Sequence, residues 1–268
     1  GRPSAAGAAA AMTTPAGVTL LALVGLGLVV GSFLNVCVYR LPRGRSIVSP
    51  PSYCTTCGRA LRWFENVPVV GYLMLRGRCR TCREPISLLY PVVELVTPAL
   101  FLVQCWQLGW QPLLGVRLLF SCAMIVLFLI DLQHRILPNV VTIPGVVIGL
   151  VASFFVEPGW HSAALGVAVG WGLLRTISEV YFQIRGEEGL GMGDVKMLAM
   201  IGAFLGWQLM LFTLLFASLL GSLVGVVMIV LRRGDVKYAL PFGSFLAISA
   251  LVSTVVGKPF ITWYTFFY

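Results

Sequence analysis

Eight apolar stretches make up most of this sequence, and most of them reach or approach the length of a membrane-crossing helix. They cover residues 18–38, 87–108, 113–130, 140–156, 163–182, 195–206, 208–231 and 239–256. A helix of about 20 apolar residues crosses the ~30 Å hydrocarbon core of a bilayer. The sequence therefore predicts an all-α polytopic membrane protein with about eight transmembrane helices.

The composition agrees with a membrane protein rather than a soluble one. The chain is 58% hydrophobic and 11% charged, whereas about a quarter of the residues of a soluble domain are charged. Residues 1–11 are rich in Ala and Gly and precede Met12, so we interpret them as an artificial expression scar. Basic residues follow the first apolar stretch and do not precede it. We therefore expect a retained first transmembrane helix over residues 12–38, not a cleaved signal peptide.

The basic residues predict the orientation of the chain. Nine arginines lie between Arg40 and Arg83, and most other basic residues fall on the same side if all eight stretches cross the membrane. Membrane proteins carry an excess of Lys and Arg in their cytoplasmic loops, so we expect this side to face the cytoplasm. The net charge of +9 is then explained by topology. The sequence has no basic patch with interleaved aromatic residues, so we expect no nucleic-acid partner.

The long polar segment at residues 39–86 contains four cysteines in two C-x2-C pairs separated by 21 residues: Cys54, Cys57, Cys79 and Cys82. Two such pairs are typical of a tetrahedral zinc site with four thiolate ligands. Disulfides are disfavoured on a cytoplasmic face, and no βαβ pattern supports a thioredoxin-like redox pair. We expect a structural zinc, because four thiolates leave no open position for water. So short a segment with few large apolar residues would depend on metal binding for its fold.

Two aspartates, Asp131 and Asp194, stand where apolar stretches meet the predicted cytoplasmic face. A carboxylate beside lipid costs about 2.5 to 3.5 kcal/mol on insertion scales, so acids at such positions indicate function. Two of them on one face suggest the catalytic pair of an intramembrane aspartyl protease. Each also has a structural interpretation: Asp131 as a solvated helix end, and Asp194 as an N-cap.

Asp194 belongs to a glycine-rich run at residues 189–196. We expect Gly191 and Gly193 to form a substrate-approach loop, since they leave room for an extended peptide backbone beside the carboxylate. Asp194 opens a predicted helix, where an anion is favoured, and Asp131 closes one, where it is disfavoured. Helix polarity alone thus predicts that Asp131 holds the proton shared by the pair.

Glu94 lies inside an apolar stretch, between Pro91 and Pro98, at a depth where contact with water does not explain it. We expect it to face the interior of the helix bundle, with polar pairing and ligand binding as equally open roles. Arg175 and Glu179, four residues apart, can pair on one helix face.

Several ordered blocks of this sequence resemble the type IV prepilin peptidases, the bifunctional leader peptidase and N-methyltransferase family of type IV pilus and type II secretion systems. The blocks are GSFLNV (31–36), RLP (40–42), the two C-x2-C pairs, NVP (66–68), LRGRC (75–79), YPVVEL (90–95), Asp131 with LPN (137–139), GMGDVK (191–196) and PFG (241–243). They span nearly everything after Met12. The family often has proline where this chain has Ser244, a departure that we judge minor because it lies outside both catalytic blocks.

The resemblance implies an activity and a division of the chain. Asp131 and Asp194 would be the catalytic pair of a Gly-x-Gly-Asp protease that cleaves prepilins or pseudopilins at the cytoplasmic face of the bacterial inner membrane. The enzyme would then methylate the new amino terminus, usually phenylalanine, with S-adenosylmethionine. Residues 39–86 would be the methyltransferase-associated insert, and residues 87–268 the transmembrane protease domain.

No glycine-rich dinucleotide fingerprint locates the methyl donor, so the candidate region is the insert with its adjoining helix, including Arg76, Gly77 and Glu94. An alternative is a peptidase without methyltransferase activity, although such relatives lack the four-cysteine insert. A transporter that uses buried carboxylates is a further alternative, but the sequence has no internal repeat of the kind that transporters show.

Overall fold

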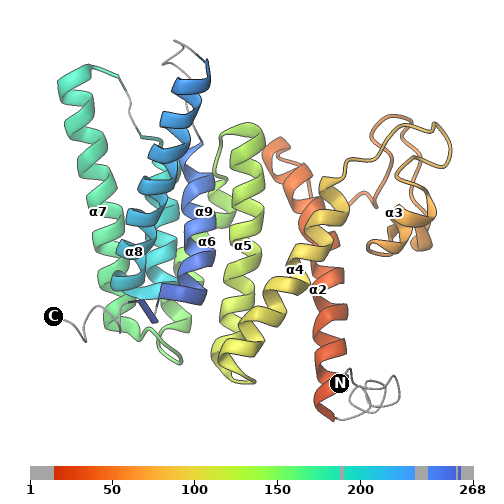
Figure 1. Cartoon of the computed structure of the whole chain (residues 1–268), viewed down its shortest axis with the longest axis horizontal. Coiled ribbons are helices and arrows are strands. Elements are labelled where there is room, and N and C mark those ends of the chain that lie inside the picture. The colour runs from red at the N-terminus through yellow and green to blue at the C-terminus, as the bar shows by residue number, and fades with distance from the viewer. Residues whose placement is uncertain (1–14, 188–189, 233–240, 258, 261–268) are drawn as a thin grey trace. The chain divides into compact units, whose positions relative to one another are not determined.

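The computed structural model describes residues 15–187, 190–232, 241–257 and 259–260, and Figure 1 labels its elements. Over these ranges the chain is helical, with two isolated β-bridges and no strand. The elements are α2 (Pro15–Arg40), η1 (Leu41–Arg43), η2 (Trp63–Asn66), α3 (Val70–Met74), α4 (Leu89–Leu108), α5 (Pro112–His134), α6 (Asn139–Ala152), α7 (Trp160–Arg185), α8 (Met192–Arg232), α9 (Phe242–Val252) and η3 (Ser253–Gly257). The interpreted scar at 1–11, Gly189 and the basic residues of 233–240 lie outside the described residues.

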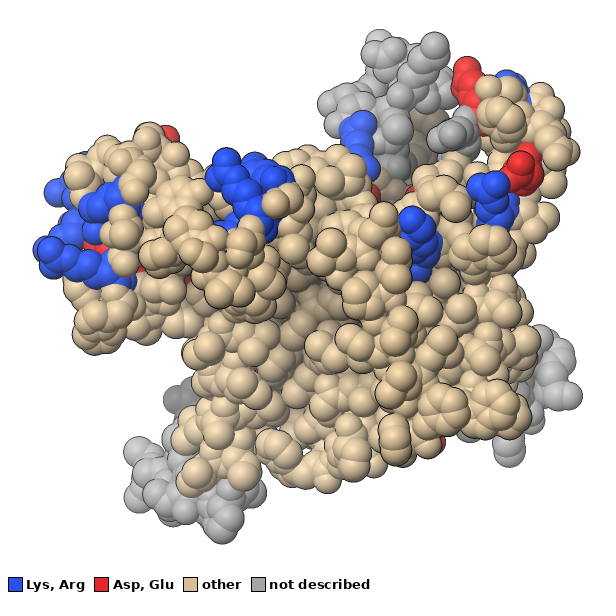
Figure 2. Space-filling view, turned by 180° about the vertical axis from the view of Figure 1, so that it is seen from behind, with Lys and Arg blue, Asp and Glu red and all other residues tan. Residues whose placement is uncertain are grey.

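The helical membrane architecture predicted from the sequence is confirmed. Five helices are long and apolar enough to cross a membrane: Gly17–Arg43, Leu89–Leu108, Pro112–His134, Trp160–Arg185 and Met192–Leu231. Two shorter apolar helices cover Asn139–Ala152 and Phe242–Gly257. The number of eight transmembrane helices stays a prediction, because the two shorter helices do not reach spanning length. Figure 2 shows basic side chains gathered on the insert and tan, uncharged surface along the sides of the helices.

The long helix α8 is interrupted at Gly206, where the sequence pattern predicts a break between two stretches. Gly206 has φ 80° and ψ 170°, which is not helical. Its backbone also passes close to the loop before α7, since an added Cβ would lie 2.9 Å from Cβ of Pro158 and would overlap Oγ of Ser162. A positive φ and a close approach together require glycine here.

Contacts divide the chain into two compact units. The first comprises residues 1–40 and 44–107, and so holds α2, the insert and α4. The second comprises residues 41–43 and 108–268, and holds α5 to α9.

In the first unit, α2 and α4 pack closely through small residues. An added Cβ at Gly27 would lie 2.6 Å from Cα of Pro98, and one at Gly31 would lie 2.9 Å from Cα of Glu94. Asn35 Nδ2 donates a hydrogen bond of 3.1 Å to the carbonyl of Tyr90. Small residues let helix backbones approach in membranes, where burial of apolar surface alone does not drive helix association.

In the second unit, α8 is surrounded by its neighbours. An added Cβ at Gly166 of α7 would lie 2.6 Å from the carbonyl oxygen of Gly202, and one at Gly149 of α6 would lie 2.8 Å from Cβ of Ala203. The core contains Phe120, Met124, Leu127, Leu174, Val195, Met197, Leu198, Met200, Ile201, Phe204, Leu205, Leu209, Met210, Ala217, Leu246, Ala247 and Ala250. Val195 directly follows Asp194 and is fully buried, so the core fixes the start of α8.

Candidate functional sites

The four insert cysteines lie in two turns of the same form. In each turn the first cysteine, Cys54 or Cys79, donates its N–H to a carbonyl five residues later at 2.9 Å. Its carbonyl accepts the N–H of the residue four positions later, at 2.9 Å from Gly58 and at 3.1 Å from Arg83. These two residues have φ of 69° and 61°. A side chain disfavours this left-handed conformation, so Arg83 is the more strained of the two.

The cysteine geometry fits a zinc ion. The four sulfur atoms all lie within 4.8 Å of one another. Cys54 Sγ and Cys82 Sγ are 3.7 Å apart, close to the ~3.8 Å edge of a tetrahedron with zinc–sulfur bonds of about 2.3 Å. A disulfide would bring two sulfurs to about 2.05 Å, and all four cysteines are free thiols. The structure thus brings together all four predicted ligands.

The pKa values of the thiols also differ, and a bound cation would favour the thiolate form of all four. The N–H groups of Cys82 and Thr81 lower the pKa of Cys79 to about 6. The N–H of Glu84 favours the Cys82 thiolate, but burial and the neighbouring sulfurs outweigh it and raise the pKa of Cys82 to about 12. Four crowded thiolates repel one another, and a divalent metal bound among them would offset that repulsion.

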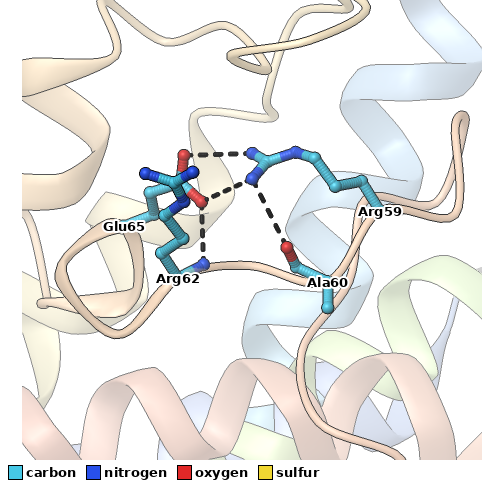
Figure 3. Close-up of polar contacts among 4 residues, drawn as sticks. All are labelled: Arg59, Ala60, Arg62 and Glu65. Carbon is cyan, nitrogen blue, oxygen red and sulfur yellow. Dashed lines mark hydrogen bonds and ion pairs between the residues drawn. The ribbon is translucent and has the colours of Figure 1, made fainter.

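An ion pair stabilises the insert beside the first cysteine turn, as Figure 3 shows. Arg59 Nη1 and Nη2 each lie 3.0 Å from a carboxylate oxygen of Glu65, and the N–H of Arg62 donates to Glu65 Oε2 at 2.8 Å. The Arg59 guanidinium holds the pKa of Glu65 below its usual range. A bidentate pair of this kind fixes direction as well as distance, so it orients η2 against the first cysteine turn.

A cavity of about 400 Å³ lies in the first unit, lined by α2, the insert and α4. Glu94 lines this cavity, with 7% of its surface exposed. Its Oε2 accepts the N–H of Val69 at 2.7 Å, and Val69 has a φ of 60°, which is unusual for a β-branched residue. Glu94 therefore faces the interior, as predicted, and ties α4 to the insert. Arg76 and Gly77 are not among the lining residues.

Asp131 lies on the last turn of α5, with 5% of its surface exposed. Its Oδ2 accepts two hydrogen bonds from Ser244: from the N–H at 2.6 Å and from Oγ at 2.9 Å. Ser244 is in the first turn of α9, directly after Pro241, Phe242 and Gly243. The carboxylate of Asp131 is therefore held at the N-terminus of α9, where N–H groups and the helix dipole favour an anion.

Asp194 lies in the first turn of α8 and is half-buried. Its N–H donates to the carbonyl of Gly191 at 3.0 Å. The carboxylates of Asp131 and Asp194 are close enough for their charges to interact. The second unit thus brings together two acids that are 63 positions apart, 194 minus 131, in the sequence.

Leu137 packs against Gly193, which precedes Asp194, and against Gly243, which precedes Ser244. An added Cβ at Gly193 would be 2.9 Å from Leu137 Cβ, and one at Gly243 would be 2.9 Å from Leu137 Cδ1. Contact with Leu137 is therefore sufficient reason for glycine at position 193. An added Cβ at Gly191 would meet only Asp194 Oδ2 at 3.4 Å and the Gly193 nitrogen at 3.9 Å. Apart from the two chain neighbours of Gly191, no other described residue lies within 4 Å of that added Cβ, and the role of Gly191 in substrate approach stays a prediction.

Two polar pairs lie in the second unit. Lys196 Nζ donates to Oδ1 of Asn139 at 2.9 Å, which connects the starts of α8 and α6. Arg175 and Glu179 form the i, i+4 ion pair predicted from their spacing, at 2.7 Å.

Sequence reasoning missed Ser244. It treated the position as minor, but the structure places this side chain directly on Asp131. The polarity argument for the shared proton also loses its basis. It considered only α5, which Asp131 closes, whereas the side chain reaches the N-terminus of α9. The position of Ser244 after a Pro-Phe-Gly block was the only available signal, and nothing in that block points to Asp131.

Comparison with known proteins places most of this chain in one family. Residues 26–108 match the bacterial peptidase A24 N-terminal domain, and residues 118–226 match the type IV leader peptidase family. No solved structure matches.

Curated relatives agree over most of the chain. A prepilin leader peptidase/N-methyltransferase of Pseudomonas putida is 38% identical over 87% of this chain and 88% of the relative. One of Pseudomonas aeruginosa is 36% identical over 89% and 90%. One of Myxococcus xanthus is 43% identical over 76% of this chain and 61% of the relative.

Proposed function

Because the chain belongs to the type IV leader peptidase family, we propose that it cleaves the leader peptides of prepilins and then methylates the new amino terminus. The names of its relatives support both activities, and neither a single-activity peptidase nor a transporter is favoured. We place the enzyme in the bacterial inner membrane as a multi-pass protein, with its aspartates facing the cytoplasm.

For the cleavage we propose Asp131 and Asp194 as the catalytic pair. The observation that carries this assignment is the hydrogen-bonded carboxylate of Asp131 beside a second acid. Asp131, as the anion, takes a proton from water while the water oxygen attacks the scissile carbonyl carbon. Asp194, as the acid, gives its proton to the carbonyl oxygen. When the carbon–nitrogen bond then breaks, a proton passes to the leaving amine and the pair returns to its starting state.

Substitution of each aspartate tests this assignment. Asp131→Asn and Asp194→Asn should each abolish cleavage of a pilin-like peptide, because one carboxylate cannot serve as both base and acid. Glu179→Gln, which removes an exposed carboxylate of α7, is the matched control and should cleave normally. Mass spectrometry with and without S-adenosylmethionine reports the cleavage position and methylation together. A variant that keeps more than a few per cent of wild-type turnover would contradict the assignment.

For the methyl transfer we propose the 400 Å³ cavity of the first unit as the donor site. Its size is typical of small-molecule sites. The carboxylate of Glu94 and the aromatic rings of Tyr39, Tyr72 and Tyr90 line it, and these groups suit a sulfonium cation and an adenine ring. A donor held there would supply an electrophilic methyl group to the amine nitrogen.

Glu94→Gln tests the donor site, because the amide keeps the shape of the side chain and removes its charge. We expect at least tenfold weaker binding of S-adenosylmethionine, measured without peptide, and slower methylation, with cleavage retained. Arg76→Gln, in the insert but outside the cavity lining, should leave both unchanged. If Arg76→Gln weakened donor binding and Glu94→Gln did not, the donor site would instead lie at the Arg76–Gly77 loop.

For the insert we propose one structural zinc held by Cys54, Cys57, Cys79 and Cys82. The metal would hold the two cysteine turns together. It would thereby also form the wall of the donor cavity, since Cys54 and Cys79 line it.

A further inference from the structure

A second cavity, of about 330 Å³, adjoins the proposed donor cavity within the first unit. The two cavities share a wall made by Ser32, Val36, Arg40, Ser52 and Asn66. The first three of these residues are spaced four apart on α2, so they lie on one face of that helix. The two cavities therefore lie side by side along this face of α2.

The shared wall is rigid. Arg40 is buried, and its guanidinium donates to the carbonyls of Ser46 at 3.0 Å, Pro50 at 2.7 Å and Pro51 at 3.4 Å. These bonds hold residues 46–51 of the insert against the end of α2. The second cavity is thus preformed and does not depend on a ligand to shape it.

The second cavity differs from the first in chemistry. It is lined by Val29 and Phe33 of α2 and by Val48, Pro50 and Pro68 of the insert, and it has no carboxylate in its lining. Val29 and Phe33 belong to a membrane-crossing helix. The polar residues of its lining, Ser32, Arg40, Ser52 and Asn66, all belong to the shared wall, and the rest of the lining is apolar. The apolar part suits an apolar side chain and the polar wall suits an amine.

We propose that this second cavity, lined by Val29 and Phe33, is the acceptor subsite for methylation and holds the apolar side chain of the first residue of the cleaved substrate. Methyl transfer requires the amine nitrogen about 3 to 3.5 Å from the methyl carbon. The α-amine and the side chain of the first residue leave the same carbon. With the side chain in the second cavity, the amine lies at the shared wall and faces the donor cavity. The proposal rests on the proposed function, because it needs the donor in the first cavity.

Two substitutions change the second cavity without touching the first. Val29→Trp fills it and Phe33→Ala enlarges it, and neither residue lines the donor cavity. The full-length protein in lipid vesicles is given peptides that already begin at the mature amino terminus, with Phe or Ala as first residue, so that methylation is measured without cleavage. Val29→Trp should lower kcat/KM for the Phe peptide at least tenfold and for the Ala peptide much less. Phe33→Ala should lower the preference for Phe over Ala.

Leu26→Trp is the matched control. Leu26 is on the same helix and 52% exposed, compared with 63% for Val29, and it lines neither cavity. Methylation of both peptides by this variant should equal that of wild type. Equal loss on the Phe and Ala peptides in Val29→Trp, or no change in either cavity variant, would overturn the proposal. Loss of a bound lipid in native mass spectrometry of Val29→Trp with unchanged peptide preference would also overturn it and assign the cavity to an acyl chain.

Binding of S-adenosylmethionine, measured without peptide, separates this proposal from the one on which it rests. Val29→Trp should bind it as wild type does. If Glu94→Gln also bound it normally, the donor placement would fail. The preference of Val29→Trp for the Phe peptide over the Ala peptide would still decide whether the second cavity binds the side chain of the first substrate residue.

Discussion

Gly243→Ala should reduce cleavage by moving Asp131 while leaving the fold intact. The new methyl group would lie 3.0 Å from Asp131 Oδ2, 3.1 Å from its Cγ and 2.9 Å from Leu137 Cδ1. Ordinary contacts begin at 3.4 Å, so the carboxylate must move by about 0.4 Å, the difference between 3.4 and 3.0. Overpacking of this kind costs about 1 to 3 kcal/mol, and a displacement of 1 Å in a catalytic group lowers rates up to ~100-fold. Scaled to a shift of about 0.4 Å, that dependence predicts that kcat falls up to about sixfold.

The assay is cleavage of a pilin-like peptide, with kcat and KM measured separately. KM should stay near wild type, because the change moves a reacting group and not the surface that binds the peptide. Gly172→Ala is the matched control: it adds the same methyl group within α7, where an added Cβ meets nothing within 4 Å, and should cleave normally. Wild-type kcat in Gly243→Ala, or equal losses in both variants, would refute the assignment of Asp131.

Four further outcomes follow from the sites. Ser244→Ala should lower kcat about tenfold or more with KM unchanged, since a hydrogen bond to a charged group contributes about 1.5 to 3 kcal/mol; the same peptide assay measures it, and an unchanged kcat would count against Asp131 as the anion. Cys79→Ser should lower the zinc content found by metal analysis and expose the insert to protease, and full zinc occupancy would contradict the four-thiolate site. Arg83→Gly should stabilise the zinc-loaded insert by about 1 kcal/mol, because glycine accepts the left-handed conformation; resistance to protease measures it, and a loss of resistance would refute the strain argument. Glu65→Gln should weaken the insert at pH 7, as measured by resistance to protease, because the ion pair with Arg59 lowers the folded pKa of Glu65. The deficit should be complete above the unfolded pKa of about 4.3 and should disappear as pH falls through the lowered folded pKa; a deficit independent of pH would contradict the ion pair as its cause.

The sequence alone determined the helical membrane class and the cluster of four cysteines. Apolar length decides whether a segment can cross a bilayer, and that length is read directly from the chain. The break at Gly206 was visible for a related reason, since polar and glycine residues interrupt the apolar pattern there. The four cysteines could equally be predicted from the sequence, because each C-x2-C turn is formed by residues adjacent in the chain. Only the contact between the two turns depends on the tertiary structure.

Sequence reasoning also singled out Asp131, Asp194 and Glu94, because ionisable groups in apolar stretches are rare and expensive. It did not give their partners. The N–H that bonds Glu94 belongs to Val69, in an irregular part of the insert that no periodicity describes. The role of glycine at 193 depends on Leu137, which is far from it in sequence and adjacent in space.

Only the tertiary structure decided the environment of Asp131. The sequence shows which helix carries this residue, and from that helix alone an anion is disfavoured. The side chain reaches the N-terminus of α9, more than 100 positions away, where the N–H and hydroxyl of Ser244 hold it. Electrostatic stabilisation depends on distance in space and not on position in the chain, so helix packing removes the basis of the expectation for Asp131.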